Sequence, residues 1–147
     1  MVFSKKFALT AVLVMTMAAG AIAQSDPIVA RKAMMKSNGA AIGTLAKMAK
    51  GEAPFDAAAA KQALESLHGA AGFADLFPVG SDQGDTKAKD TIWSDNAGFK
   101  AALAKFIAAA DAQAANPPKD VDGVKAALAA IGPTCQGCHQ TYRKPQS

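Results

Sequence analysis

The sequence predicts an all-α protein folded as an antiparallel four-helix bundle, and three observations lead to that prediction. Alanine dominates the composition, β-branched runs are few, and no stretch alternates apolar with polar residues, so helix propensity is high almost throughout. Apolar residues recur at helical spacing in four segments. Capping residues, glycines and prolines separate these segments by mostly short connections, which is typical of antiparallel neighbours in a bundle.

Capping and turn residues set the expected bounds of the four helices. The first runs from Asp26-Pro27 to Gly51, the second from Asp56 toward Phe77, the third from Ser94 or Asp95 to Asn116-Pro117-Pro118, and the fourth from Val121 to Tyr142. The stretch 78–90 is rich in Gly, Asp, Ser and Lys and is predicted to be a loop. A kink or local irregularity is expected at Gly132-Pro133, because proline removes a helical hydrogen bond.

Each helix carries an apolar face that we expect to be buried. The faces are Ile28, Met35, Ile42, Leu45 and Ala49 in the first helix; Leu64, Leu67 and Ala71 in the second; Phe99, Leu103, Phe106, Ile107 and Ala110 in the third; and Val121, Val124, Leu128, Ile131, Cys135, Cys138 and Tyr142 in the fourth. The spacing of the last set is 3, 4, 3, 4, 3, 4, which makes a narrow seam. Both cysteines should therefore face the core, with His139 beside them.

The first residues have the features of a secretory signal peptide. Lys5 and Lys6 precede an apolar run of thirteen residues, Phe7–Ala19, and Ala21-Ile22-Ala23 supplies a small-residue cleavage site. This run is shorter than the roughly 20 residues that a spanning helix needs, which disfavours a membrane anchor. We therefore expect residues 1–23 to be removed after Ala23, and 24–147 to form one exported domain.

Composition excludes several classes of function. The net charge is +4 for the whole chain and +2 without Lys5 and Lys6, which is too small and too evenly spread to predict binding to nucleic acid or to an anionic membrane. No acid pair, Ser/His/Asp set or glycine-rich phosphate loop stands out, so no catalytic residues are predicted and the protein is not expected to be an enzyme.

The motif that carries chemistry is Cys135-Gln136-Gly137-Cys138-His139, a C-x-x-C-H sequence. Two thiols at this spacing can add to the two vinyl groups of haem, and the next residue is then held where its imidazole can reach the iron. The sequence therefore predicts one covalent haem c attached through Cys135 and Cys138, with His139 as an axial iron ligand. Export fits this prediction, because c-type haem is attached outside the cytoplasm.

Three other interpretations of the two cysteines are weaker. A disulfide between them would close too small a loop to stabilise the fold much, although a haem-free helical module with such a bridge stays an alternative. A thioredoxin-like redox pair belongs at a helix start in a βαβ context, whereas this motif ends a helical chain. A closed zinc site needs four ligands, and besides the motif only His68 offers one.

The sequence resembles the class II cytochromes c, a family that comprises cytochrome c′ and its low-spin relatives. The resemblance covers nearly the whole chain after the signal peptide. It rests on Arg31-Lys32-Ala33-Met34-Met35-Lys36, Gly51-Glu52-Ala53-Pro54-Phe55-Asp56, Phe77-Pro78, Ile92-Trp93 and the haem motif near the C-terminus, Cys135 to Arg143. The family resemblance implies an antiparallel four-helix bundle that holds haem among its helices, here near the C-terminal helix.

The resemblance implies one of two functions, which differ on the far side of the haem. In the low-spin relatives a methionine of the first helix ligates the iron and the protein carries electrons, and Met35 falls at that position. In cytochrome c′ the iron is five-coordinate and binds nitric oxide or carbon monoxide. We expect the low-spin form, with Met35 as second axial ligand. Packing without ligation is the alternative for Met35, and Met34 points about 100° away around the helix.

Further haem contacts are implied by the same resemblance. Arg31 could pair with a haem propionate, with an exposed surface arginine as the alternative. Arg143 lies one turn after His139, and Thr91 occupies a loop position that lines the haem in relatives. The protein is expected to exchange electrons with partner proteins in the periplasm, as a monomer or a homodimer without stable membrane insertion.

Overall fold

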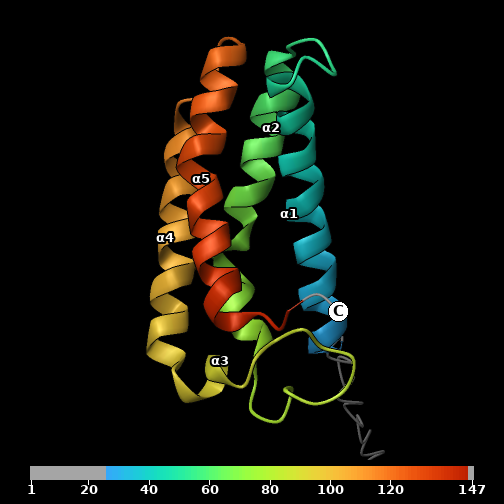
Figure 1. Ribbon diagram of the computed structural model, residues 1–147, viewed down its shortest axis with the longest axis vertical. Coiled ribbons are helices and arrows are strands. Elements are labelled where there is room, and N and C mark those ends of the chain that lie inside the picture. The colour runs from blue at the N-terminus through green and yellow to red at the C-terminus, as the bar shows by residue number, and fades with distance from the viewer. Residues whose placement is uncertain (1–25, 146–147) are drawn as a thin grey trace, which may run out of the picture.

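The computed structural model describes residues 26–145 and shows a bundle of four long helices (Figure 1). These are α1 (Pro27–Ala49), α2 (Ala57–His68), α4 (Asn96–Ala115) and α5 (Val121–Tyr142). Consecutive long helices run in opposite directions, and each packs against two neighbours, which closes the bundle in the order α1, α2, α4, α5. The predicted antiparallel four-helix bundle is confirmed. The expected signal peptide, 1–23, lies outside the described residues.

Aspartate side chains begin all four long helices. In each case the side-chain Oδ1 accepts a hydrogen bond from a backbone N–H of the first turn, which would otherwise lack a partner. The pairs are Asp26 with Ile28 N at 2.8 Å, Asp56 with Ala59 N at 3.0 Å, Asp95 with Gly98 N at 3.1 Å, and Asp120 with Gly123 N at 2.8 Å. At the other end of α1, Gly51 adopts φ +74°, a left-handed conformation that glycine takes without strain. The bounds expected from the sequence therefore agree closely with the observed ones.

The core has two parts along the bundle axis. Aliphatic side chains fill the half near the α1–α2 and α4–α5 connections, including the fully buried Leu45, Leu64 and Val124. An aromatic cluster fills the other half, where ring centroids lie 4.8–6.0 Å apart in edge-to-face arrangements. Its members are Phe73, Phe77, Trp93, Phe99 and Tyr142. As expected, Tyr142 is a core residue.

Two short helices and one register change differ from the sequence-based expectations. The end of the second segment is a 3₁₀ helix, η1 (Gly69–Leu76), and the one-turn helix α3 (Thr91–Ser94) precedes α4. A 3₁₀ helix has 3.0 residues per turn instead of 3.6, so side chains after Gly69 rotate away from the expected face. Ala70 is consequently buried and Ala71 exposed, and the predicted burial of Ala71 is wrong.

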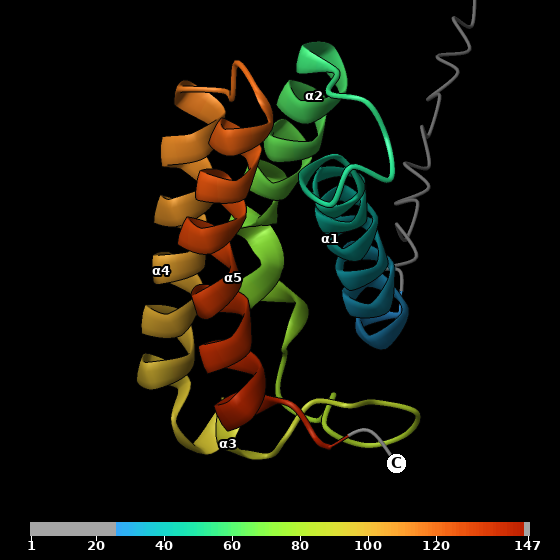
Figure 2. The same cartoon turned by 45° about the horizontal axis from the view of Figure 1, so that its top comes forward.

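Helix α5 continues through Gly132-Pro133 as a single α-helix, and the proline does not divide it into two helices. Among the described residues, no helix is long and apolar enough to span a bilayer. The segment 78–90 is a loop up to the start of α3, as predicted, and crosses the end of the bundle where α1 begins and α5 ends (Figure 2). This loop and the two helix ends surround the site described next.

Candidate haem site

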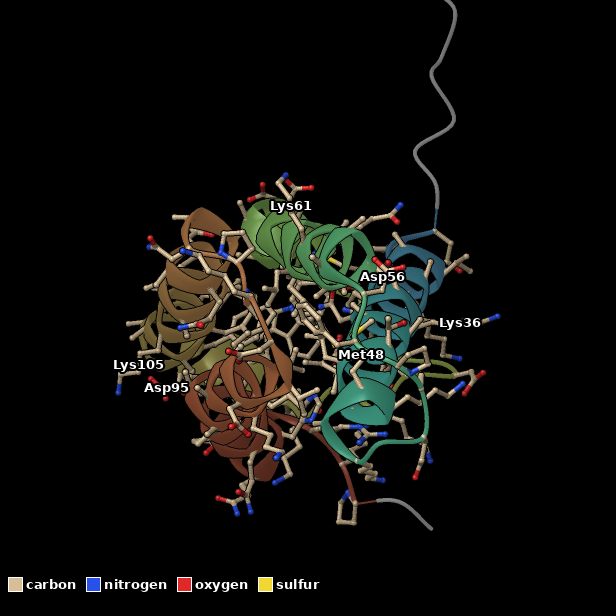
Figure 3. The ribbon with its side chains drawn as sticks, turned by 90° about the horizontal axis from the view of Figure 1, so that it is seen from above. Lys36, Met48, Asp56, Lys61, Asp95 and Lys105 are labelled. Carbon is tan, nitrogen blue, oxygen red and sulfur yellow. The ribbon has the colours of Figure 1, made fainter. Side chains whose placement is uncertain are left out.

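A cavity of about 540 Å³ lies between the first half of α1 and the second half of α5. Its volume is within the range of roughly 300–1,000 Å³ that is typical of cofactor and ligand pockets. Aromatic and aliphatic side chains from all four long helices and from η1 form its inner wall: Ile42, Leu67, Phe73, Phe99, Leu103, Phe106 and Leu128. Figure 3 shows, along the bundle axis, side chains from these helices converging on the interior. The cavity is therefore suited to a large, mainly apolar group.

Helix α5 places the three residues of the predicted haem motif along one wall of this cavity. Cys135 and Cys138 are half-buried free thiols, and His139 is more exposed, but all three line the cavity. Residues three and four apart on a helix share a face, so the α-helical conformation itself brings the two sulfurs and the imidazole together. The predicted position of the motif on the apolar seam of the last helix is confirmed.

Burial shifts the pKa of all three groups toward their neutral forms. Burial raises the pKa of both the Cys135 and Cys138 thiols, and in Cys138 the neighbouring Cys135 adds to this effect. Burial, and secondarily the positive charge of Arg143, lowers the pKa of His139. At neutral pH the imidazole therefore has a free nitrogen lone pair, which is the form that binds a metal.

Met35 faces the same cavity from α1, the helix that packs against α5. Its side chain is half-buried, as are those of Ile28 and Ile42 on the same stripe, because this stripe borders the cavity. The densest packing of α1 lies further along the helix, at Leu45 and Met48. Met34 is also half-buried but does not line the cavity. Of the two adjacent methionines, Met35 alone lines the cavity with His139.

Arg31 is buried at the edge of the cavity, with 5% of its surface exposed. Its guanidinium donates to the carbonyl of Leu76 at 3.3 Å, to Ser81 Oγ at 3.1 Å, to the Ser81 carbonyl at 2.7 Å and to Thr86 Oγ1 at 3.3 Å. The guanidinium carbon also lies 4.6 Å from the ring centroid of Phe77. Burial excludes the exposed surface arginine considered from the sequence.

The acceptors of Arg31 identify what this residue does in the fold. Ser81 and Thr86 belong to the loop 78–90, so Arg31 ties that loop to the first turns of α1. The second tie between these segments is the exposed ion pair of Lys32 with Asp85. Desolvation lowers the pKa of Arg31, but a guanidinium stays charged at any ordinary pH. A fixed positive charge is therefore held beside the cavity.

The other two predicted haem contacts, Arg143 and Thr91, lie in different places relative to the cavity. Arg143 lines the cavity one turn after His139, as expected. Thr91 is exposed and outside the cavity lining, and its hydroxyl donates to the carbonyl of Thr141 at 3.1 Å. The structure thus gives Thr91 a contact between α3 and the end of α5, and its contact with haem stays a prediction.

Several cavity residues were missed from the sequence. Asn38 follows Met35 by three positions, is half-buried and lines the cavity. The spacing of Arg31, Met35, Asn38 and Ile42 is 4, 3, 4, so a helical-face argument that included polar residues would have found it. Lys87 lines the cavity from the loop 78–90, and no sequence pattern indicates which loop residues return to the bundle. His68 was considered as a zinc ligand, but its side chain is outside the described part of the structure.

The residues present fit haem c. Two thiols are available for thioether bonds, an imidazole follows them on the same wall, and an apolar cavity of suitable volume receives the ring. The cationic residues Arg31, Lys32, Lys87 and Arg143 line the cavity, where they can neutralise carboxylates. Among the described residues, no group of three or more His, Cys, Asp or Glu side chains could hold a metal ion. Fold and site together define a helical-bundle haem protein of the c type.

Comparison with known proteins identifies the family. The family model described as Cytochrome C′ matches residues 26–143. Cytochrome c-556 of Agrobacterium fabrum strain C58 is 45% identical over 126 residues, which cover 85% of this chain and 86% of that protein. Cytochrome c′ of Rhodopseudomonas palustris strain CGA009 is 39% identical over 86% of this chain and 88% of its own length. The chain belongs to the cytochrome c′ family.

The solved structures agree with this assignment. The structure of a cytochrome c′ from Rhodopseudomonas palustris superposes with a TM-score of 0.79 at 37% identity, over 84% of this chain and all of that one. The cofactor is therefore haem c, and the protein is a haem c electron-carrying protein of the class II type. Relatives with both names, c-556 and c′, occur among the matches, so the family assignment leaves open how many protein ligands the iron has.

Proposed function

We propose that this protein is a periplasmic electron carrier in which both His139 and Met35 ligate the iron of one haem c. The observation that carries the proposal is that Met35 on α1 and His139 on α5 line one cavity from two helices that pack against each other. When bound, haem supplies the iron that takes up and releases one electron. Thioether bonds to Cys135 and Cys138 would hold the ring beside His139.

The chain's own contribution is to hold these ligands and to limit access of water. The apolar inner wall, with Phe99 and Leu103 among its members, would limit access of water to the iron. A thioether ligand favours ferrous iron and so raises the reduction potential. The loop 78–90, held by Arg31, covers the end of the bundle beside the cavity. A carrier of this type needs no catalytic residue. It needs iron ligands held in fixed positions and a surface through which electrons can pass.

The test of iron ligation is a pair of single substitutions, Met35→Ala and Met34→Ala. We expect the wild type to show sharp reduced bands, a ferric thioether–iron band in the red, and no reaction with carbon monoxide. Met35→Ala should lose the red band and become high-spin, whereas Met34→Ala, the matched control from the next position, should keep both features. An unchanged spectrum in Met35→Ala would refute ligation by Met35.

A five-coordinate gas-binding protein is the second candidate, and the cytochrome c′ name shared by several relatives favours it. In that case Met35 would pack over the open iron face. Immediate binding of carbon monoxide to the reduced wild type, with broad high-spin bands before addition, would assign this function. Export is tested separately: the mass of the purified protein should equal that of residues 24–147 plus one haem.

A further inference from the structure

Asn38 differs from the other uncharged polar side chains of the cavity wall in its hydrogen bonding. The others each bond within the protein: Thr86 Oγ1 accepts from Arg31 at 3.3 Å, the Thr134 hydroxyl donates to the Ile131 carbonyl at 2.6 Å, and the Tyr142 hydroxyl donates to Asp95 at 2.9 Å. The side chain of Asn38 forms no hydrogen bond with another described residue. No side-chain nitrogen or oxygen of the described residues is both buried and unpaired, so the Asn38 amide is accessible to a group that fills the cavity.

An amide at this position does not favour the fold of the chain by itself. Asn38 is half-buried and lies between Met35 and Ile42 on the stripe of α1 that borders the cavity. Asparagine is a poor residue for a helix interior, because its side chain competes for backbone hydrogen bonds. An amide beside an apolar wall also loses hydrogen bonds to water that no protein group replaces. We therefore expect the amide to act on what the cavity holds.

The helix directs Asn38 toward Met35. Side chains of an α-helix lean toward its N-terminus, and residues three apart have Cβ atoms roughly 5–6 Å from each other on the same face. Asn38 follows Met35 by three positions and lines the same cavity. Lys36 lies on the opposite side of α1, and Figure 3 shows it pointing away from the bundle. The amide therefore lies beside the part of the cavity that Met35 borders.

The cationic end of the cavity lies on the other side of Met35. Arg31 and Lys32 precede Met35 on α1, and Arg31 is bonded to the loop 78–90. Asn38 follows Arg31 by seven residues, which places the two roughly 10 Å apart along the helix axis. Cationic side chains suit the carboxylates of haem, so these belong at the end near Arg31. The position of Asn38 instead suits the iron side of Met35.

We propose that Asn38 is a positioning residue, whose amide N–H donates a hydrogen bond to the atom in the sixth coordination position of the iron, on the α1 side of haem. The proposal deepens the proposed function and rests on it for the identity of that atom, the Met35 sulfur. A donor at the sulfur withdraws electron density, which disfavours ferric iron more than ferrous iron. Hydrogen bonds to metal ligands tune the metal in this way. Asn38 should therefore raise the reduction potential.

The first experiment compares Asn38→Leu with Ser37→Leu in the holoprotein. Leucine replaces the amide of Asn38 by an apolar group of the same branched shape, and Ser37 is the adjacent exposed residue outside the cavity lining. Each protein is equilibrated with a redox dye of known potential, and the ratio of ferrous to ferric protein is read from the absorption spectrum. Far-UV circular dichroism checks that the variants fold.

We expect the ferrous-to-ferric ratio of Asn38→Leu to fall about two- to tenfold at a fixed dye potential, which is the equilibrium equivalent of one net hydrogen bond. Ser37→Leu should keep the wild-type ratio, and Asn38→Gln, which retains an amide donor, should recover part of the loss. An unchanged ratio in Asn38→Leu would overturn the proposal. A raised ratio would also overturn it, because the amide would then act only through local polarity.

The second experiment places carbon monoxide in the sixth position and reads its infrared stretching frequency. Ferrous Met35→Ala is compared with Met35→Ala/Asn38→Leu. A hydrogen bond to the bound oxygen atom weakens the C–O bond, so the double variant should show a higher frequency and release carbon monoxide several-fold faster. Equal frequencies would overturn the proposal.

This comparison separates the role of Asn38 from iron ligation by Met35. If Met35 does not ligate the iron, the wild type binds carbon monoxide itself, and wild type and Asn38→Leu are compared directly. A frequency shift would then support the hydrogen bond from Asn38 while ligation by Met35 fails. Equal frequencies together with the spectral change expected for Met35→Ala would refute the role of Asn38 alone.

Discussion

Replacement of Arg31 by methionine should destabilise the holoprotein by about 2–4 kcal/mol. Four hydrogen bonds from the guanidinium, of 2.7–3.3 Å, and the contact with the Phe77 ring would be lost. Bonds to a charged group contribute about 1.5–3 kcal/mol each and the ring contact about 1 kcal/mol. Most of this is offset because the variant no longer buries a charge, which costs several kcal/mol. Methionine fills part of the same space, so the backbone need not collapse.

The assay is urea denaturation of the holoprotein followed by far-UV circular dichroism, combined with amide hydrogen exchange of the loop 78–90. Exchange in this loop should accelerate more than in α4, because Arg31 holds Ser81 and Thr86 directly. Lys32→Met is the matched control. It breaks the other tie to the same loop, but that ion pair is exposed, and its loss should leave the unfolding midpoint almost unchanged.

The reasoning would be refuted if Arg31→Met unfolded within about 0.5 kcal/mol of the wild type, the usual range for surface substitutions. It would also be refuted if Lys32→Met accelerated exchange in the loop as much as Arg31→Met. The first result would mean that the desolvation of the guanidinium cancels its hydrogen bonds. The second would mean that the loop is held by surface charge and not by the buried contacts.

Three more substitutions test the packing. Gly98→Ala should destabilise by about 1–3 kcal/mol in thermal unfolding, because a Cβ there would overlap Tyr142 Oη and Asp95 Oδ2. The control Gly43→Ala, which places its Cβ with nothing within 4 Å, should be neutral or stabilising. Leu45→Ala removes a fully buried side chain and should cost about 2–5 kcal/mol in urea denaturation. Burial and the hydrogen bond to Asp95 raise the pKa of Tyr142 above its usual value of 10.0. The free energy of unfolding should therefore fall as the pH rises above about 10. Tyr142→Phe should remove that part of the pH dependence in alkaline unfolding curves.

The helices could be predicted from sequence because their signals are local. Asp26, Asp56, Asp95 and Asp120 each cap the helix that follows, and caps, prolines and apolar spacing need no knowledge of distant residues. The change to 3₁₀ geometry after His68 had no such signal, and the assignment of Ala71 failed for that reason. Helix propensity does not distinguish an α-helix from a 3₁₀ helix whose bounds are set by tertiary packing.

The site was predictable where its residues share one helix. Cys135, Cys138 and His139 have fixed relative positions on α5, and Met35 follows from the apolar stripe of α1 together with the family resemblance. The partners of Arg31 could not be predicted, because they lie 45–55 residues away in a loop with no periodicity. The contact that Thr91 makes with the end of α5 was also beyond prediction from the sequence, because it depends on how that loop returns to the bundle.

The size of the cavity makes haem a structural component as well as a redox centre. Bound haem would cover the apolar wall of this cavity of about 540 Å³, and burial of apolar surface stabilises a fold by about 25 cal/mol per Å². A group held by the folded chain alone shifts the unfolding equilibrium toward the folded state. We therefore expect the chain with haem attached to unfold at a higher urea concentration than the same chain without haem.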